Sequence, residues 1–220
     1  MSEQLFHPQL PPARQMTEES PTGAALLGEI ELIPTNYFAP LDLAQVFPRP
    51  APLEVDIGCG DGAFLAAQAG RFPERNFLGL EKLAGRVRRA CKKASRMALP
   101  NVRVLRIESA YAIQYLLPPA SVDVVHLLFP DPWPKKKHRR RRIVTADFLA
   151  LVQRVLVPNG RFRIATDQKD YFEAMRELIA PTAFVEMTPA AEETFPLTTF
   201  EKHFLREGAP IYRLELRKVS

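Results

Sequence analysis

The sequence predicts an α/β protein with a doubly wound, mostly parallel sheet of seven strands. Two observations lead to this fold class: short apolar segments alternate with amphipathic ones from Leu53 onward, and the chain ends in two strand-like segments that suit a hairpin. The chain has 220 residues, of which 46% are hydrophobic and 25% are charged. Because this is enough for one sizeable core and short for two, we expect residues 53–220 to form a single domain.

The predicted elements follow one another along this domain. Apolar or alternating segments predict strands at Leu53–Ile57, Asn76–Glu81, Asn101–Ile107, Val122–Phe129, Arg161–Thr166, Phe184–Met187 and Ile211–Val219, the last with the alternation of an edge strand. Helical spacing of apolar residues predicts helices at Asp61–Arg71, Ala84–Met97, Ala110–Leu117, Val144–Leu156 and Tyr171–Ile179. Ligands of such sheets bind at the carboxyl ends of the strands, so we expect the functional residues there.

The first 52 residues contain nine of the 21 prolines. Because proline disfavours helices and central strands, we expect a poorly ordered arm over residues 1–30 and an extended segment over residues 31–52 that packs on the core. The N-terminus lacks the apolar region of a signal peptide, and no apolar run approaches the ~18 residues of a membrane span. Cys59 and Cys91 are isolated, which disfavours disulfides and a metal site. A cytoplasmic protein without a metal is expected.

Three glycines follow the first predicted strand, in Val55-Asp56-Ile57-Gly58-Cys59-Gly60-Asp61-Gly62. Glycine lets the backbone turn tightly and approach a ligand beside a helix N-terminus. The spacing also fits the dinucleotide fingerprint, and a tight turn without function is a further alternative. However, the carboxylate of Asp56 attracts the ammonium and sulfonium charges of S-adenosylmethionine and repels a pyrophosphate. We therefore predict that Asp56, Gly58 and Gly60 bind S-adenosylmethionine.

Carboxylates also end the next two predicted strands. Glu81 follows Gly58 by 23 residues, which suits an acidic residue that binds both ribose hydroxyls. Glu108 is a candidate acceptor for the adenine amino group, with Ser109 beside it. Acidic residues at strand ends and in exposed turns also occur without function, so a structural role is the alternative for both carboxylates.

Asp131 lies between two prolines directly after the most apolar predicted strand. The prolines stiffen the loop and hold the carboxylate on a rigid rim. Trp133, the one tryptophan, is either a core residue or a surface on which a base stacks. Residues 135–142 then carry seven Lys and Arg and no Asp or Glu, whereas the rest of the chain has 23 against 25. Such a concentrated cationic segment attracts polyanions through phosphate contacts.

Six motifs occur in order between about Leu53 and Leu216: Asp56-Ile57-Gly58-Cys59-Gly60, Leu78-Gly79-Leu80-Glu81, Phe129-Pro130-Asp131-Pro132-Trp133, Arg141-Arg142-Ile143-Val144, Ala165-Thr166-Asp167 and Thr198-Thr199-Phe200-Glu201. Together they resemble the bacterial tRNA (guanine-N7-)-methyltransferase family, and the third motif with its basic continuation is the most specific. The resemblance implies the Rossmann-like fold of S-adenosylmethionine-dependent methyltransferases. It also implies that the substrate is tRNA and that the product is N7-methylguanosine at position 46, in the variable loop. No obligate protein partner is evident.

The resemblance also implies roles for individual residues. Asp56, Glu81, Glu108 and Asp131 match the family's S-adenosylmethionine-binding positions, and Asp131 also matches its catalytic residue. Substrate contacts are implied at Lys135, Asp167, Thr198, Thr199, Phe200 and Glu201, and RNA contacts at Lys137, His138, Arg139, Arg140, Arg141 and Arg142. The sequence departs from the family's pattern at three positions, with Thr199 in place of Lys, Pro134 in place of His and Glu108 in place of Asp or Asn.

The chemistry of the target atom limits what the residues must do. Guanine N7 carries an in-plane lone pair, so we expect direct in-line displacement at the methyl group, with catalysis by orientation and electrostatics. Asp131 is expected to position the base by accepting hydrogen bonds from N1–H and the N2 amino group. Asp167 is a second candidate acceptor or, alternatively, a helix N-cap. His126, on a buried strand, is expected to be a satisfied core residue.

Three other functions remain alternatives at this point. A non-catalytic RNA-binding protein on the same fold predicts no affinity for S-adenosylmethionine. A nicotinamide-dependent oxidoreductase predicts binding of NADH instead. A methyltransferase for small molecules or proteins leaves the basic segment without a role.

Overall fold

The computed structural model describes residues 29–187 and 196–219. Their strands form one eight-stranded sheet in the order β1-β4-β3-β2-β5-β6-β8-β7. The strands are β1 (Glu31–Leu32), β2 (Leu53–Ile57), β3 (Asn76–Glu81), β4 (Val102–Arg106), β5 (Val122–Leu128), β6 (Leu156–Thr166), β7 (Phe184–Glu186) and β8 (Tyr212–Lys218). Neighbouring strands from β1 to β6 are parallel, and β8 is antiparallel to both β6 and β7. The predicted doubly wound α/β fold is confirmed, with one strand more than expected.

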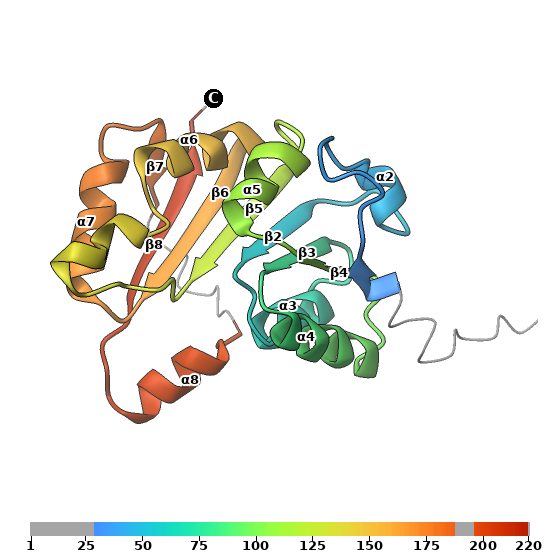
Figure 1. Ribbon diagram of the computed structural model, residues 1–220, viewed down its shortest axis with the longest axis horizontal. Coiled ribbons are helices and arrows are strands. Elements are labelled where there is room, and N and C mark those ends of the chain that lie inside the picture. Colours follow the sequence, from blue (N-terminus) through green and yellow to red (C-terminus); the bar gives the residue numbers. More distant parts are fainter. Residues whose placement is uncertain (1–28, 188–195, 220) are drawn as a thin grey trace, which may run out of the picture.

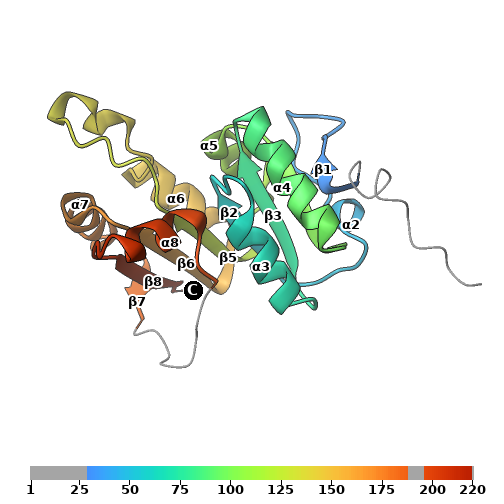
Figure 2. The same ribbon diagram turned by 90° about the horizontal axis from the view of Figure 1, so that it is seen from below.

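Helices cover both faces of this sheet (Figure 1). They are α2 (Leu43–Val46), α3 (Ala63–Arg71), α4 (Ala84–Arg96), α5 (Ser109–Tyr111) with a π-helix directly after it (Ala112–Leu116), a 3₁₀ helix (Lys136–Arg141), α6 (Ala146–Val155), α7 (Lys169–Ile179) and α8 (Thr199–Arg206). Helices α3, α4 and α8 lie on one face, and α5 and α6 lie on the other (Figures 1 and 2). Within the described ranges, no helix has the length and apolar character needed to span a bilayer.

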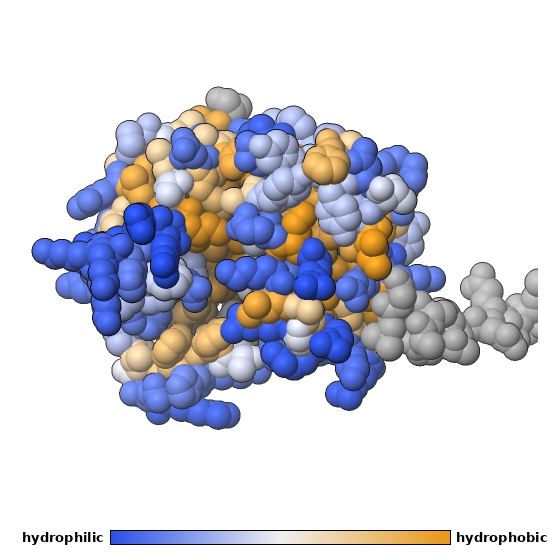
Figure 3. All heavy atoms as spheres, in the orientation of Figure 1, coloured by the Kyte–Doolittle hydropathy of each residue, from blue (hydrophilic) through white to orange (hydrophobic). Residues whose placement is uncertain are grey.

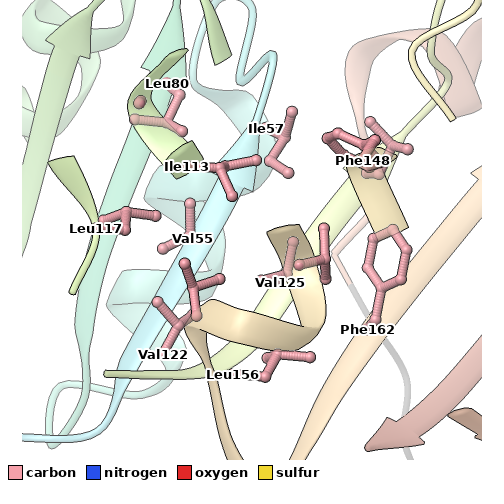
Figure 4. Close-up of a cluster of buried hydrophobic side chains, with 14 of the residues drawn as sticks. Val55, Ile57, Leu80, Ile113, Leu117, Val122, Val125, Phe148, Leu156 and Phe162 are labelled. Carbon is pink, nitrogen blue, oxygen red and sulfur yellow. The ribbon is translucent and has the colours of Figure 1, made fainter. Parts of the chain in front are cut away.

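Buried apolar side chains hold these layers together. Because side chains alternate along a strand, Val55 and Ile57 of β2 point to the same face, where they join a cluster with Ile113 of the π-helix and Phe148 of α6 (Figure 4). On the opposite face, α3 and α4 pack over a second cluster that includes Phe77 of β3. Both faces of the parallel part of the sheet are therefore covered, as such sheets require.

Two carboxylates interrupt the apolar pattern on the α3 face of β2. Glu54 is buried, with its Oε2 2.8 Å from Nε2 of His126, and its Oε1 accepts a hydrogen bond of 2.7 Å from Arg75. Burial opposes ionisation, but the interactions with His126 and Arg75 outweigh it and lower the pKa of Glu54 to about 2. This confirms His126 as a satisfied core residue. Asp56, two residues further on, lies at the carboxyl end of the strand.

The topology brings two loops together at that end of the sheet. After β2 the chain adds β3 and β4 on one side and then returns to place β5 on the other side of β2. The carboxyl ends of β2 and β5 therefore flank the switch point, where ligands of doubly wound sheets bind. The glycine-rich loop after β2 and the Asp131 loop after β5 meet there.

Two details of the topology differ from the predictions. The expected edge strand, β8, is an interior strand that lies between β6 and β7. Its sequence alternates although both of its faces are buried: Leu214 and Leu216 lie on one face, and Glu215 lies on the other, where it pairs with Arg163 at 3.1 Å. The eighth strand, β1, pairs with β4 and is too short to produce a sequence pattern. The expected arm over residues 1–30 lies outside the described residues except for its last two.

Candidate active site

A cavity of about 920 Å³ opens at the carboxyl ends of β2 and β5. Eleven of the residues selected from the sequence line it: Asp56, Gly58, Gly60, Glu81, Glu108, Ser109, Asp131, Arg141, Thr198, Thr199 and Phe200. The remaining ones are not part of its lining: Lys135, Lys137, His138, Arg139, Arg140, Arg142, Asp167 and Glu201. The structure thus collects all the residues expected to bind the cofactor around one cavity and leaves most of the basic segment outside it.

The glycine loop leaves space on the cavity side. Gly58 and Gly60 have φ values of 71° and 59°, in the left-handed region that favours glycine. A Cβ atom at Gly58 would meet no atom within 4 Å, and one at Gly60 would meet only a carbonyl oxygen at 3.9 Å. Gly62 differs, because a Cβ atom there would lie 2.6 Å from Cβ of Ala90 in α4. The first two glycines therefore border open space for a ligand, whereas the third permits close helix packing.

Two carboxylates lie side by side at the floor of the cavity. Burial, together with the negative charge of Glu81, raises the pKa of Asp56 to about 7. Glu81 is fixed by two backbone N–H groups, with Gly60 donating to Oε2 at 3.2 Å and Leu83 donating to Oε1 at 2.9 Å. Arg86 lies 3.8 Å from Oε2 of Glu81. A positively charged ligand in this cavity would relieve the repulsion between the two carboxylates.

Glu108 and Ser109 lie on the rim of the cavity beyond β4. Glu108 is the N-cap of α5, since its Oε2 accepts a hydrogen bond of 2.9 Å from the backbone N–H of Tyr111. Ser109 is the first residue of that helix. Glu108 therefore has a structural role, and its carboxylate is also exposed to the cavity that it lines.

The Asp131 loop is held in a strained backbone conformation. Phe129 and Trp133, two residues on either side of Asp131, have φ values of 54° and 42°, which bulky residues rarely adopt. The N–H group of Phe129 donates to the carbonyl of Ala165 in β6 at 2.8 Å, which fixes the start of the loop. The carboxylate of Asp131 is exposed at the cavity. The loop thus presents one fixed acidic group at the entrance.

Trp133 and Arg142 tie the basic segment to the protein. The Trp133 ring lies under the guanidinium of Arg141, at 4.9 Å, so the tryptophan supports this segment and is not a core residue. Arg142 is buried, donates to the carbonyl of Pro132 at 2.8 Å and pairs with Asp170 of α7 at 2.7 Å. The RNA contact expected at Arg142 therefore conflicts with its burial, and we assign this residue to anchoring instead.

The other cations of the segment point outward. All of them are exposed, although Arg139 also lies 3.2 Å from Asp170; they are Lys135, Lys136, Lys137, Arg139, Arg140 and Arg141. The 3₁₀ helix, which carries all of them except Lys135, projects from the body of the molecule (Figure 2). Figure 3 shows a dense group of hydrophilic residues on the same side. His138 is half-buried, with its ring 5.9 Å from that of Trp133.

Helix α8 closes the cavity from the α3 side. Thr198 and Glu201 form a capping box, in which Thr198 Oγ1 accepts from the N–H of Glu201 at 2.9 Å and the Glu201 side chain accepts from the N–H of Thr198. Thr199 Oγ1 donates to Asp61 in the glycine loop at 3.3 Å. Phe200 is half exposed at the cavity. Glu201 is buried and also pairs with Arg213, so it has a structural role as the partner of Thr198 in this capping box.

Asp167 follows β6 and is partly exposed, outside the cavity lining. It is not the N-cap of α7, because that position is occupied by Gln168, so the capping alternative is wrong. The sequence analysis missed Lys82, Arg86 and Arg89, which line the cavity from the β3–α4 side. All three lie within eight residues of a predicted strand that ends in a carboxylate, and this position was the signal that would have found them.

Comparisons with known proteins agree with this fold and identify relatives of the chain. A family model described as "Putative methyltransferase" matches residues 50–214. A tRNA (guanine-N(7)-)-methyltransferase of Geobacter metallireducens is 34% identical over 199 residues, covering 86% of this chain and 92% of the relative. One of the same name from Alkalilimnicola ehrlichii is 38% identical over 186 residues, covering 81% and 78%.

Two solved structures show the same fold at low sequence identity. The 16S rRNA methyltransferase KamB superposes with a TM-score of 0.60 at 17% identity, covering 81% of this chain and 93% of that one. A SAM-dependent methyltransferase from Aquifex aeolicus gives a TM-score of 0.55 at 14% identity, covering 80% and 87%. The family rests on the curated relatives, which are 34% and 38% identical to this chain over most of their length, so the chain belongs to the tRNA (guanine-N7-)-methyltransferase family.

Proposed function

We propose that this protein transfers a methyl group from S-adenosylmethionine to N7 of a guanine in tRNA, at position 46 of the variable loop. The observation that carries the proposal is the juxtaposition of an acidic cavity at the switch point with an exposed cationic segment at its entrance. The cavity suits a cationic methyl donor, and the segment suits a polyanionic acceptor. The family of the chain supports the same pair of substrates.

The residues present fit the methyl donor. Asp56 and Glu81 supply negative charge at the floor, and the absence of side chains at Gly58 and Gly60 leaves room for a ligand. When bound, S-adenosylmethionine supplies a methyl group made electrophilic by the sulfonium charge. Asp56 is suited to bind an ammonium group and Glu81 to bind ribose hydroxyls, while Glu108 and Ser109 lie on the rim for the adenine.

Asp131 positions the base that accepts the methyl group. Its carboxylate is held between two strained residues, so little side-chain or loop freedom is lost when a guanine binds. It accepts hydrogen bonds from the N1–H and the N2 amino group and stabilises the positive charge that develops on the base. No proton has to leave N7, so a general base is not required.

Exposed cations of residues 135–141 bind the phosphates of the tRNA backbone. These contacts are independent of sequence and set the register of the RNA on the enzyme. Lys135 lies next to the Asp131 loop, and Asp167 and Phe200 are further substrate contacts on neighbouring elements. With a tRNA substrate, the proposed location is the cytoplasm, and the proposed reaction includes no further protein.

Methyl transfer from labelled S-adenosylmethionine to tRNA tests this function. A transcript with 7-deazaguanosine at position 46 lacks the accepting nitrogen and is expected to remain unlabelled, whereas the same replacement at another guanosine leaves labelling unchanged. Asp131→Asn keeps the shape of the side chain and is expected to lower kcat by about 100-fold. Labelling of the deaza transcript, binding of NADH in place of S-adenosylmethionine, or full activity of the Asn variant would each contradict the proposal.

A further inference from the structure

Helix α4 carries a broad cationic face in addition to the basic segment. Val87, Ala90, Cys91 and Ala94 pack against the sheet, and the rest of the circumference is occupied by Arg86, Arg88, Arg89, Lys92, Lys93 and Arg96, with no acidic residue in the helix. At 3.6 residues per turn, Arg88, Lys92 and Arg96 form one line along the helix, flanked by Arg89 and Lys93. The helix has 13 residues, so this face is about 20 Å long.

Most of these cations have no carboxylate partner among residues 29–187 and 196–219. Lys93 pairs with Asp61 at 3.0 Å, and Arg86 lies 3.8 Å from Glu81. Arg88, Arg89, Lys92 and Arg96 form no ion pair in that part of the chain, and all four are exposed. Closely spaced like charges on one helix repel one another, so this arrangement costs stability unless an anion binds to it.

The excess positive charge of the chain is concentrated in two segments. Residues 82–96 and 135–142 each carry seven Lys and Arg and no Asp or Glu, and the remaining residues carry 16 Lys and Arg against 25 Asp and Glu. The positive net charge of the protein therefore comes from these two segments. A polyanion that approaches the molecule is attracted to them and repelled by the remainder.

Both segments border the same opening. Arg86 and Arg89 line the cavity from the α4 side, and Arg141 lines it from the side of the 3₁₀ helix. The N-terminal end of α4 and the 3₁₀ helix both lie at the carboxyl edge of the sheet, on either side of it (Figure 2), and residues of both segments line the cavity there. A ligand that touches both surfaces must extend beyond the cavity on two sides, which suits a structured RNA and not a small anion.

We infer that the exposed face of α4 is a second phosphate-binding surface for the tRNA, opposite the basic 3₁₀ segment. This inference rests on the proposed function, because the RNA that enters the cavity is the occupant of both surfaces. The tRNA backbone crosses the opening with the target base directed to Asp131 between them. Arg88 and Lys92 bind phosphates, and neither residue contributes to the cavity lining.

Neutralising Arg88 and Lys92 together tests the inference. The double variant Arg88→Gln/Lys92→Gln retains residues with good helix propensity. Loss of two phosphate contacts is expected to weaken tRNA binding about tenfold at 0.1 M salt and to reduce the slope of log affinity against log salt by about 1.4 to 1.8. Affinity for S-adenosylmethionine, measured by calorimetry, is expected to stay unchanged.

The matched control removes the same charge at the other edge of the sheet. Arg176 and Arg217 lie near the C-terminus of α7 and the C-terminus of β8, away from the cavity lining. The variant Arg176→Gln/Arg217→Gln is expected to keep the wild-type salt slope within about 0.5. A wild-type slope in the α4 variant, equal losses in both variants, or altered self-association with unchanged tRNA affinity would each overturn the inference. A wild-type protein that does not methylate tRNA would instead refute the proposed function.

Discussion

Protonation of Asp56 links the binding of the methyl donor to pH. In the free protein, burial and the charge of Glu81 raise the pKa of Asp56 to about 7. A cationic ligand binds to the ionised carboxylate, so binding requires loss of a proton at lower pH. The ionised fraction rises from about 9% at pH 6 to about 91% at pH 8, which corresponds to about tenfold tighter binding at pH 8.

The same group sets a pH dependence of stability with the opposite sign. Because the pKa of Asp56 is raised from 3.8 to about 7 on folding, the folded protein binds more protons between these values, and its stability falls as pH rises through that window. The full difference amounts to about 4 kcal/mol above pH 7. Asp56→Asn removes the buried charge, so the unliganded variant is expected to be more stable than the wild type at pH 8 by about 2 to 4 kcal/mol. Its Tm should rise by roughly 4 to 16 °C.

Calorimetric titration of the wild type and the Asn variant with S-adenosylmethionine at pH 6 and pH 8 measures the effect. The variant is expected to bind weakly at both pH values, and it retains any titration of the ligand itself, so it isolates the contribution of Asp56. Scanning calorimetry of the unliganded proteins supplies the stability difference, which should vanish near pH 4. Equal wild-type affinities at pH 6 and pH 8, or a variant less stable than the wild type at pH 8, would refute the reasoning.

Two further predictions concern groups outside the cavity. Arg142→Gln breaks the pair with Asp170 that anchors the Asp131 loop, so kcat/KM for tRNA should fall about tenfold at all salt concentrations. The matched variant Arg140→Gln removes an exposed charge and should lose only salt-sensitive binding. An Arg142→Gln effect that disappears at high salt would contradict the anchoring role. Burial lowers the pKa of His126 below 6.5, so stability is lost as pH falls below that value. The variant His126→Gln retains a hydrogen-bond donor for Glu54 and should flatten the dependence of Tm on pH below 6.5. An unchanged profile would show that another group titrates.

The parts of the fold predicted most accurately are those fixed by local pattern. The bounds of the strands Leu53–Ile57 and Asn76–Glu81 agree with the prediction, because each is a short, mostly apolar segment that ends at a glycine or a charged residue. Strand β8 has the pattern of an edge strand, yet it is interior, because buried Glu215 and Arg163 pair across two strands that are distant in sequence. Local pattern does not contain such pairings.

The residues expected to bind the cofactor lie around one cavity because glycines and carboxylates at the ends of neighbouring parallel strands meet at the same edge of the sheet. The left-handed conformations of Phe129 and Trp133 were not predicted from the sequence, since nothing in the two side chains favours positive φ and only the surrounding contacts impose it. Arg142 illustrates the same limit: within a run of like residues, sequence does not distinguish a buried anchor from exposed neighbours.

The acidic and the basic groups lie at different depths in the cavity, so one opening accommodates two substrates of opposite charge. Asp56 and Glu81 are buried at the floor, where low polarity strengthens their attraction for a cation. The exposed cations of α4 and of the 3₁₀ segment lie at the rim, where solvent and salt weaken their repulsion of the same ligand. A large polyanion contacts many rim charges at once and gains from releasing counterions, so weak individual contacts are sufficient for it. The acidic floor repels phosphate and leaves the uncharged base as the part of the RNA best suited to enter.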